Sequence, residues 1–245
     1  CESYRALPMT LHKDFNMGAF RGLREKFGFR KEKKKNGPDL RGLLWKRALE
    51  QSAEFVEDNL EQALIFADSD KIRDYAFRQR CAEGLLLEFG VYQGASINAF
   101  ARELIRIRDG RRIFGFDAFL GLSEDWSGHG IEKHAHFNLG GRPPLVENNV
   151  TLVKGWVEDT LPSFLDQHAG PISFMHIDTD TYSPCKTILS LCKDRLVPGS
   201  IVLFDELLSY PGWRVGEFKA LNECIDRNRY CWKAFAGHRA MLVMK

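Results

Sequence analysis

Short apolar runs and segments with helical periodicity alternate along most of this chain. Five of the apolar runs suit buried strands: Leu85–Leu87, Arg112–Phe116, Asn149–Lys154, Pro171–Ile177 and Ser200–Phe204. Segments with the composition or spacing of helices lie between most of them: Ala95–Ile107, Glu158–His168, Pro184–Leu196 and Val215–Asn228. Strands that alternate with helices predict right-handed crossovers and a mainly parallel sheet. We therefore expect a doubly wound α/β fold, whose ligand crevice lies at the carboxyl ends of the strands.

The two ends of the chain add further predicted elements. Apolar residues between Leu43 and Arg80 recur at spacings near three, four and seven, which predicts helix. Residues 68–70, Asp-Ser-Asp, predict a break into two helices, because Asp and Ser favour caps over helix interiors. At the other end, Trp232–Phe235 and Ala240–Met244 predict two strands around a short turn, and hence an antiparallel edge of the sheet.

Length and composition suit one large domain with an extension. The chain has 245 residues, of which 44% are hydrophobic, and this is enough for a sizeable α/β core. We place an N-terminal helical extension, which serves as a substrate lid or makes oligomer contacts, at residues 1–80 and the sheet domain at residues 81–245. Residues 1–40 predict a loose segment that packs on the main domain or on a second subunit.

Charge and cysteine content narrow the possible partners. A net charge of +2 without a broad basic stripe disfavours a nucleic-acid partner. No apolar stretch approaches the roughly 20 residues that a membrane helix needs. Six cysteines without a CxxC pair or zinc-like spacing indicate free thiols in a reducing cytosol, so we expect a cytoplasmic protein. The chain begins at Cys1 rather than Met, which leaves its natural N-terminus open.

A glycine-rich segment follows the first predicted strand. Residues 88–96 have the pattern E-x-G-x-x-x-G-x-S, formed by Glu88, Gly90, Gly94 and Ser96. The two glycines lack a Cβ, so the backbone can turn tightly and approach a ligand. The pattern differs from the G-x-G-x-x-G of pyrophosphate sites and fits an adenosine with a short charged tail better. Asp117 ends the next strand, 29 residues after Glu88, where a carboxylate can accept hydrogen bonds from two ribose hydroxyls.

Acidic residues end four of the five predicted parallel strands. They are Glu88, Asp117, Asp178 and the pair Asp205-Glu206. Asp and Glu are also common turn and cap residues, which explains one or two of these positions but explains all four together poorly. Three of them, Asp178, Asp205 and Glu206, offer hard oxygen ligands of the kind that Mg²⁺ or another divalent cation takes. Asp180 suits a further ligand or a turn cap equally well.

The longest irregular segment, residues 121–148, is typical of a functional lid or a disordered insertion. Its three histidines, His129, His134 and His136, are loosely spaced and have no cysteines nearby, which disfavours structural zinc. Imidazole titrates near neutral pH, so His129 is a candidate general base, and a solvated loop histidine is the alternative. His176, inside a predicted strand, is better interpreted as a core histidine.

Five segments, taken together and in this order, resemble one family. They are LEFGVYQGASI (87–97), GFDAFLGLSEDW (115–126), VKGWVEDTLPSFL (153–165), MHIDTDTYSPCKTIL (175–189) and PGSIVLFDELLSYPGW (198–213). This part of the chain resembles the class I S-adenosylmethionine-dependent methyltransferases, and within them the macrocin O-methyltransferase group of TylF, MycF and NovP. The resemblance implies a seven-stranded Rossmann-like sheet. It also implies Mg²⁺-dependent O-methylation, in characterised relatives on sugar or aromatic hydroxyls of secondary metabolites, and a homodimer or higher homo-oligomer.

The resemblance also implies roles for single residues. The turn of Glu88, Gly90, Gly94 and Ser96 would hold the methionine part of the methyl donor, and Asp117 its ribose. Gly155, Trp156 and Val157 would flank the adenine, and Asp178 would complete this set. The metal would be bound by Asp178, Asp205 and Glu206, where several relatives have Asp in place of Glu206. The proton acceptor would be Asp178 or His129, and the candidate substrate walls are Trp126, His129, Tyr210 and Trp213.

Other functions remain as alternatives at this stage. A non-catalytic S-adenosylmethionine-binding module is disfavoured because such a protein need not keep a set of metal-binding acids. A nicotinamide-dependent oxidoreductase is disfavoured by the glycine pattern. A methyltransferase acting on nucleic-acid amino groups is disfavoured because the fourth strand ends in HIDTDTY rather than in an asparagine-proline-proline-tyrosine type motif.

Overall fold

The computed structural model describes residues 37–245. The expectation of a loose segment at residues 1–40 lies almost entirely outside this range. The chain divides into two compact units, Cys1–Asp39 and Leu40–Lys245, and the second contains the whole sheet. This unit begins well before the predicted domain boundary at residue 81. The first helices therefore belong with the sheet, while the role predicted for them as a lid or oligomer contact stays a prediction.

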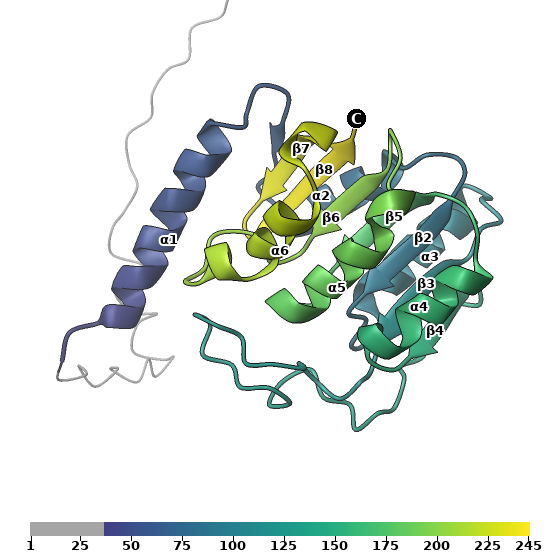
Figure 1. Cartoon of the computed structure of the whole chain (residues 1–245), viewed down its shortest axis with the longest axis horizontal. Helices are drawn as coiled ribbons and strands as arrows, with labels where there is room; N and C mark the ends of the chain where they lie inside the picture. The colour runs from purple at the N-terminus through teal and green to yellow at the C-terminus, as the bar shows by residue number, and fades with distance from the viewer. Residues whose placement is uncertain (1–36) are drawn as a thin grey trace, which may run out of the picture. The chain divides into compact units, whose positions relative to one another are not determined.

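A sheet of eight strands forms the centre of the second unit, in the order β1-β7-β8-β6-β5-β2-β3-β4 (Figure 1). Strand β8 is antiparallel to β6 and β7, and all other neighbours are parallel. The mainly parallel α/β prediction is thus confirmed. The sheet has one strand more than the expected seven, because the two-residue β1 adds to β7. The strands are β1 Leu64–Ile65, β2 Leu85–Phe89, β3 Ile113–Asp117, β4 Val150–Lys154, β5 Ile172–Ile177, β6 Ile201–Phe204, β7 Tyr230–Ala236 and β8 Arg239–Met244.

Helices cover both faces of this sheet (Figure 1). The side chain of Asp68 accepts a hydrogen bond from the backbone N–H of Asp70 and caps α2, as the sequence predicts. The predicted helix from Val215 is shorter, because Gly216 has a non-helical backbone (ψ −134°) that separates a 3₁₀ turn from α6. The helices are α1 Leu40–Glu57, α2 Ser69–Arg78, α3 Ala95–Arg106, α4 Val157–Gln167, α5 Tyr182–Cys192 and α6 Glu217–Cys224.

The two faces of the sheet bury separate apolar clusters. On the face covered by α2 and α3, the rings of Phe77 and Phe174 lie 4.9 Å apart between centroids. On the face covered by α4, α5 and α6, Phe89 stacks on Phe116 at 4.8 Å. Side chains alternate between the faces along a strand. Glu88, between Leu87 and Phe89 in β2, therefore lies on the α2–α3 face.

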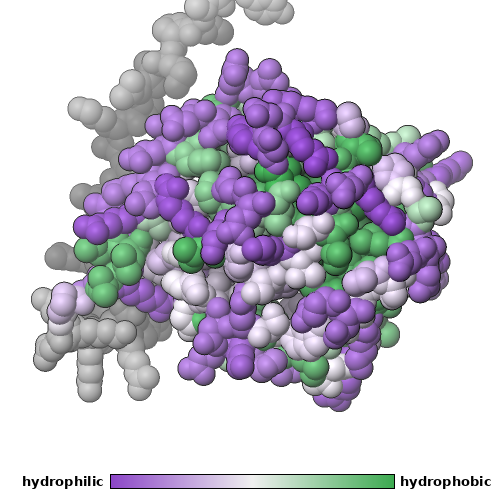
Figure 2. All heavy atoms as spheres, viewed as in Figure 1, coloured by the Kyte–Doolittle hydropathy of each residue, from purple (hydrophilic) through white to green (hydrophobic). Residues whose placement is uncertain are grey.

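Hydrophilic residues cover much of the face seen in Figure 2, with smaller hydrophobic areas between them. Across residues 37–245, no helix is long and apolar enough to cross a membrane. The cysteines in this range, at positions 81, 185, 192, 224 and 231, are all free thiols, as the sequence predicts.

Candidate functional site

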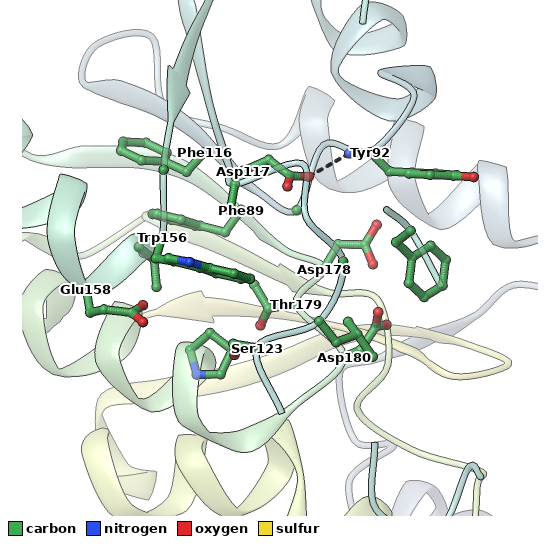
Figure 3. A pocket seen from close by; sticks show the side chains of 18 residues that line it. Phe89, Tyr92, Phe116, Asp117, Ser123, Trp156, Glu158, Asp178, Thr179 and Asp180 are labelled. Atoms are coloured by element: carbon green, nitrogen blue, oxygen red, sulfur yellow. Dashed lines mark hydrogen bonds between the residues drawn. The ribbon is translucent and has the colours of Figure 1, made fainter. Parts of the chain in front are cut away.

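A cavity of about 160 Å³ opens at the carboxyl ends of β2, β3, β4 and β5, the edge where the sequence places the ligand crevice. Phe89 and Phe116 form part of its apolar wall. In Figure 3, the carboxylates of Asp178 and Asp180 lie at one side of this cavity, and Trp156 and Glu158 lie at the other. Acidic side chains therefore lie at both sides of the cavity, and the indole ring of Trp156 lies opposite Asp178 and Asp180.

The glycine turn, residues 90–94, shapes one wall of the cavity. Gly90 has φ +87°, and a Cβ at this position would lie 1.8 Å from the carbonyl oxygen of Asp178. The backbones of β2 and β5 approach closely here, because the N–H of Asp178 donates to the carbonyl of Phe89 at 2.8 Å. Only glycine fits this position without moving Asp178. Gly94 also has positive φ, at the N-cap of α3, but does not line the cavity.

Asp117 ties the glycine turn to the end of β3. Its Oδ2 accepts hydrogen bonds from the backbone N–H groups of Val91 and Tyr92, both at 2.8 Å (Figure 3 shows the second). Its Oδ1 accepts a 2.6 Å hydrogen bond from the N–H of Phe119. The carboxylate lines the cavity, where a ribose would lie, and also holds the backbone of the turn in place. A carboxylate has about four lone-pair sites, so further hydrogen bonds remain available to it.

Residues after β4 form the aromatic end of the cavity. Gly155, Trp156 and Val157 all line it, as the resemblance implies for an adenine pocket. The N–H of Gly155 donates to the carbonyl of Asp117 at 3.0 Å, which fixes this segment to the end of β3. The apolar and aromatic surface here suits a flat base better than a charged group.

Glu88 and Ser96, two of the predicted methionine-binding residues, do not line the cavity. Glu88 lies within β2 rather than at its end, and its side chain is fully buried on the face of the sheet that α2 and α3 cover. Ser96 Oγ donates to Glu88 Oε1 at 3.0 Å. Their hydrogen bond therefore joins β2 to the first turn of α3, outside the cavity.

Asp178 and Asp205, two of the three predicted metal ligands, lie together beyond β5 and β6. One ligand atom from each, with a nitrogen of His176, falls within a group whose members are all within 4.8 Å of one another. Glu206, the third predicted ligand, is outside this group. Arg239 donates to both oxygens of Asp205, at 2.5 and 2.9 Å. Burial opposes ionisation of Asp205, but His176 and Arg239 outweigh it and hold its pKa at about 2.

Several more carboxyl groups crowd this edge of the sheet. Burial and the neighbouring charge of Asp205 raise the pKa of Asp180 to about 7 and that of Glu206 to about 8. Burial, followed by the charges of Asp180 and Glu206, raises the pKa of Glu217 well above its usual range. Glu206 Oε2 and Glu217 Oε2 are buried without a hydrogen-bond partner. The edge thus holds more buried carboxyl groups than Arg239 and His176 pair with.

An aromatic group lies near the same acids. His129 stacks on Trp126 with ring centroids 4.0 Å apart and makes an edge contact with Trp45 of α1 at 5.4 Å. Tyr210 lies 6.0 Å from His129, and His238 Nδ1 lies 3.8 Å from Glu206 Oε2. Burial lowers the pKa of His129, with the charges of His238 and Arg41 as smaller causes.

The predicted substrate walls Trp126, His129, Tyr210 and Trp213 are not among the residues that line the cavity. Trp126, Tyr210 and Trp213 are buried, and the last two are less than 2% exposed, because all three belong to the apolar cluster on the α4–α6 face of the sheet. Sequence reasoning missed Trp45, Glu217 and Arg239. Trp45 and Arg239 reach the site from α1 and from the antiparallel strand β8, and no local pattern signals such distant contacts.

Comparison with known proteins agrees with this geometry. Residues 87–207, just under half of the chain, match a family model described as a methyltransferase domain. The crystal structure of CalS11, a calicheamicin methyltransferase, is similar with a TM-score of 0.58 and 24% identity, covering 86% of this chain and 98% of that one. An apo structure of CalS11, described as a TDP-rhamnose 3′-O-methyltransferase, has a TM-score of 0.54 and 25% identity, covering 85% and 96%.

The O-methyltransferase NovP is also similar, with a TM-score of 0.51 and 16% identity, covering 84% of this chain and 99% of that one. No match was found among curated protein sequences. The protein therefore has the Rossmann-like methyltransferase fold.

Proposed function

We propose that this protein is an S-adenosylmethionine-dependent O-methyltransferase that acts on a hydroxyl of a small molecule. One observation carries the proposal: a single cavity is lined by the glycine turn, by Asp117 and by the carboxylates of Asp178 and Asp180. The first part suits an adenosine with an amino-acid tail. The second part suits a cation and an acceptor oxygen. The methyltransferase-domain match over residues 87–207 supports the same activity.

In this proposal the methyl donor lies along the cavity. Trp156 and Val157 contact the adenine, Asp117 accepts hydrogen bonds from the ribose hydroxyls, and the backbone at Gly90 faces the methionine part. Asp178 lines the cavity near the reacting end, beyond the glycine turn. The sulfonium of the donor is already electrophilic, so the protein's main contribution is alignment, which can supply several kcal/mol.

The acidic edge fits a divalent cation. The site has hard oxygen donors, including two buried carboxyl oxygens without a hydrogen-bond partner, on Glu206 and Glu217. Asp178 and Asp205 would hold Mg²⁺, and Glu206 would reach it from the adjacent position. When bound, such an ion orients an acceptor oxygen and lowers the pKa of its hydroxyl. Arg239 and His176 hold Asp205 ionised, which keeps it ready to bind a cation.

Asp178 is the preferred proton acceptor, because it lines the cavity whereas His129 does not. Burial, followed by the charges of Asp205 and Asp180, raises the pKa of Asp178 well above its usual range, which brings it closer to that of an effective base. His129 remains the alternative base on the acceptor side. It stacks against Trp126, and the nearby His238 lies next to Glu206.

A sugar hydroxyl is the acceptor class we propose first. CalS11 is described as acting on TDP-rhamnose, and the chain covers nearly all of that structure. Phenolic hydroxyls of other secondary metabolites are the second class. The same proposal includes membership of the macrocin O-methyltransferase group, a cytoplasmic location and assembly as a homodimer or higher homo-oligomer.

Formation of S-adenosylhomocysteine tests the proposal directly. The purified chain is incubated with S-adenosylmethionine, Mg²⁺ and a panel of sugar nucleotides and phenols, with and without EDTA. We expect product with at least one acceptor class and its loss in EDTA. A thermal shift with S-adenosylhomocysteine but none with NAD excludes the oxidoreductase alternative. Donor binding without turnover on any acceptor favours the non-catalytic module, and absence of donor binding contradicts the proposal.

A further inference from the structure

Five polar side chains form a line across the sheet face that α2 and α3 cover. In order they are Ser96, Glu88, His176, Asp205 and Arg239, and we call them the buried polar row. Glu88 and His176 are 0% exposed, Asp205 is 7% and Ser96 is 9% exposed. A line of charged groups at this depth costs free energy unless every member is paired.

Strand register creates the row. Glu88 of β2 pairs with His176 of β5, and His176 pairs with Leu203 of β6. Asp205 comes two residues after Leu203 and so falls on the same face of the sheet. The phenyl ring of Phe100 from α3 packs on the His176 ring at 5.6 Å and closes the row from solvent.

Hydrogen bonds connect each member to the next. Ser96 Oγ donates to Glu88 Oε1 at 3.0 Å, and His176 Nδ1 lies 3.1 Å from Glu88 Oε2. His176 Nε2 lies 3.4 Å from Asp205 Oδ1, and Arg239 Nε donates a hydrogen bond to the same oxygen. Both partners of the imidazole are carboxylates, which accept and do not donate. The ring therefore donates from both nitrogens.

The ends of the row coincide with the two parts of the proposed site. Ser96 lies in the first turn of α3, directly after the glycine turn that lines the cavity. Asp205 is a proposed cation ligand. Moving either end alone leaves a buried charge without its hydrogen-bond partner, which costs free energy. A ligand that fixes one end therefore favours the arrangement that the other ligand needs.

We propose that His176 is a positioning residue that links the two halves of the site. It orients Asp205 for the divalent cation and Glu88 for the glycine turn, so that the methyl donor and the cation bind with positive coupling. The inference rests on the proposed function, because it takes S-adenosylmethionine and a divalent cation as the two ligands. It assigns a role to a side chain that does not line the cavity.

Coupling is measured with Mn²⁺ and S-adenosylhomocysteine as probes. The Kd of Mn²⁺ is determined by electron paramagnetic resonance with and without saturating S-adenosylhomocysteine, and the reciprocal titration is done by calorimetry. We expect each ligand to strengthen binding of the other at least about 5-fold in the wild-type chain, the lower end of ordinary coupling. The two titrations must give the same factor, because the linkage is reciprocal.

Two amide substitutions separate the two bonds of the imidazole. His176→Gln places an N–H near the Nε2 position and keeps the contact to Asp205, so Mn²⁺ affinity without the second ligand should stay within about 3-fold. His176→Asn keeps only the contact to Glu88, so Mn²⁺ affinity should fall about 10-fold, as for loss of other groups that orient a metal ligand. Each interrupts the row, so coupling should drop below about 2-fold in both.

Ser96→Ala offers a milder interruption at the far end of the row and guards against misfolded His176 variants. It should reduce the coupling while leaving Mn²⁺ affinity without the second ligand unchanged. His168→Asn is the matched control, because His168 stacks on Phe164 and bonds the Phe164 carbonyl at 2.9 Å, outside the row. Its coupling should equal that of the wild type.

The outcomes distinguish this inference from the proposed function. Failure of the wild-type chain to bind either probe overturns the proposed function. Binding of both probes without coupling overturns the inference alone, as does coupling that persists unchanged in His176→Gln and Ser96→Ala.

Discussion

The two edges of the sheet treat buried charge in opposite ways. At the amino-terminal edge, Asp109 forms ion pairs with Arg111 at 2.6 Å and Arg80 at 3.2 Å. Arg111 also donates to backbone carbonyls at Cys81 and Gly84, so each charged group here has an oppositely charged partner, and Arg80 Nε is the one atom of the three side chains that is buried without a hydrogen-bond partner. At the carboxyl edge, Glu206 and Glu217 keep orphaned oxygens, and Arg239 and His176 pair with only some of the carboxyl groups.

The difference supports the proposal that the amino-terminal edge serves stability and the carboxyl edge binds a ligand. The hydrogen bond from Arg111 outweighs the opposing effect of burial and holds the pKa of Asp109 at about 2. This is expected for a carboxylate that partners within the chain already stabilise. At the other edge the pKa values of Asp180 and Glu206 rise to about 7 and about 8, because burial and like charges disfavour ionisation. A fold keeps such a cost where a cation or substrate relieves it.

The largest expected effect is on catalysis at the carboxyl edge. Asp205→Asn removes a proposed cation ligand while keeping a polar group of the same size between His176 and Arg239. We expect turnover to fall at least roughly 1,000-fold, since a metal ion supplies several kcal/mol of transition-state stabilisation. Affinity for S-adenosylhomocysteine in EDTA should change less than about 3-fold. Normal turnover of this variant in EDTA contradicts the metal-site interpretation.

The corresponding change at the amino-terminal edge should affect folding instead. Asp109→Asn leaves Arg80, whose side chain is 5% exposed, and Arg111 without their carboxylate partner. We expect the free energy of unfolding to fall by about 2–3 kcal/mol, near the lower end for breaking a buried pair. Urea denaturation measures this loss. Turnover per folded molecule should stay at the wild-type value, and a selective loss of turnover would remove the distinction between the edges.

The two edges should also respond to pH in opposite directions. Glu206 and Asp180 have raised pKa values in the folded chain, so their contribution to stability is complete below the unfolded pKa near 4 and is lost as pH rises through about 7 to about 8. Asp109 has a lowered pKa, so its contribution is present above about pH 4 and lost as pH falls toward about 2.

Thermal unfolding in EDTA should therefore show a Tm that falls by about 5 °C between roughly pH 5 and 8.5, the size expected for one to two kcal/mol in a chain of this length. Saturating Mg²⁺ should suppress most of this fall. A pH profile that is the same with Mg²⁺ and EDTA would show that no cation relieves the acidic edge.

The smallest expected effect comes from Glu217, which lies beside the proposed ligands. Glu217→Gln retains the acceptor for the N–H of Thr179, a 3.3 Å hydrogen bond, and removes a buried charge. We expect metal-free stability at about pH 8 to rise by about 1 kcal/mol, because burial and the charges of Asp180 and Glu206 oppose ionisation of Glu217. Chemical denaturation at pH 6 and pH 8 checks that the gain is larger at the higher pH.

Local patterns in the sequence predict most of the fold. Each parallel strand from β2 to β6 is a short apolar run. Asp68 is a typical cap residue and predicts the start of α2. The sequence does not predict strand β1, the additional eighth strand of the sheet, because it has only two residues and is defined by its pairing with β7. Likewise, the boundary at residue 81 places α2 in an extension, whereas α2 packs on the sheet through Ile72 and Phe77.

The candidate site divides in the same way. Gly90, Asp117 and Asp178 follow strands that end at one edge, so their approach could be expected from the chain order alone. The position of the Glu88 side chain could not be expected in this way. A residue at the end of the strand would face the ligand crevice, whereas a residue within the strand lies on one face of the sheet. Arg239 joins Asp205 only through the pairing of β8 with β6, a contact between distant parts of the sequence.

A crystal structure with S-adenosylhomocysteine and Mn²⁺, using anomalous scattering to locate the ion, tests the central claim most directly. The account predicts the adenosine between Asp117 and Trp156, and an anomalous peak about 2.2 Å from carboxylate oxygens of Asp178 and Asp205. S-adenosylhomocysteine in the cavity without a peak at these carboxylates would contradict it.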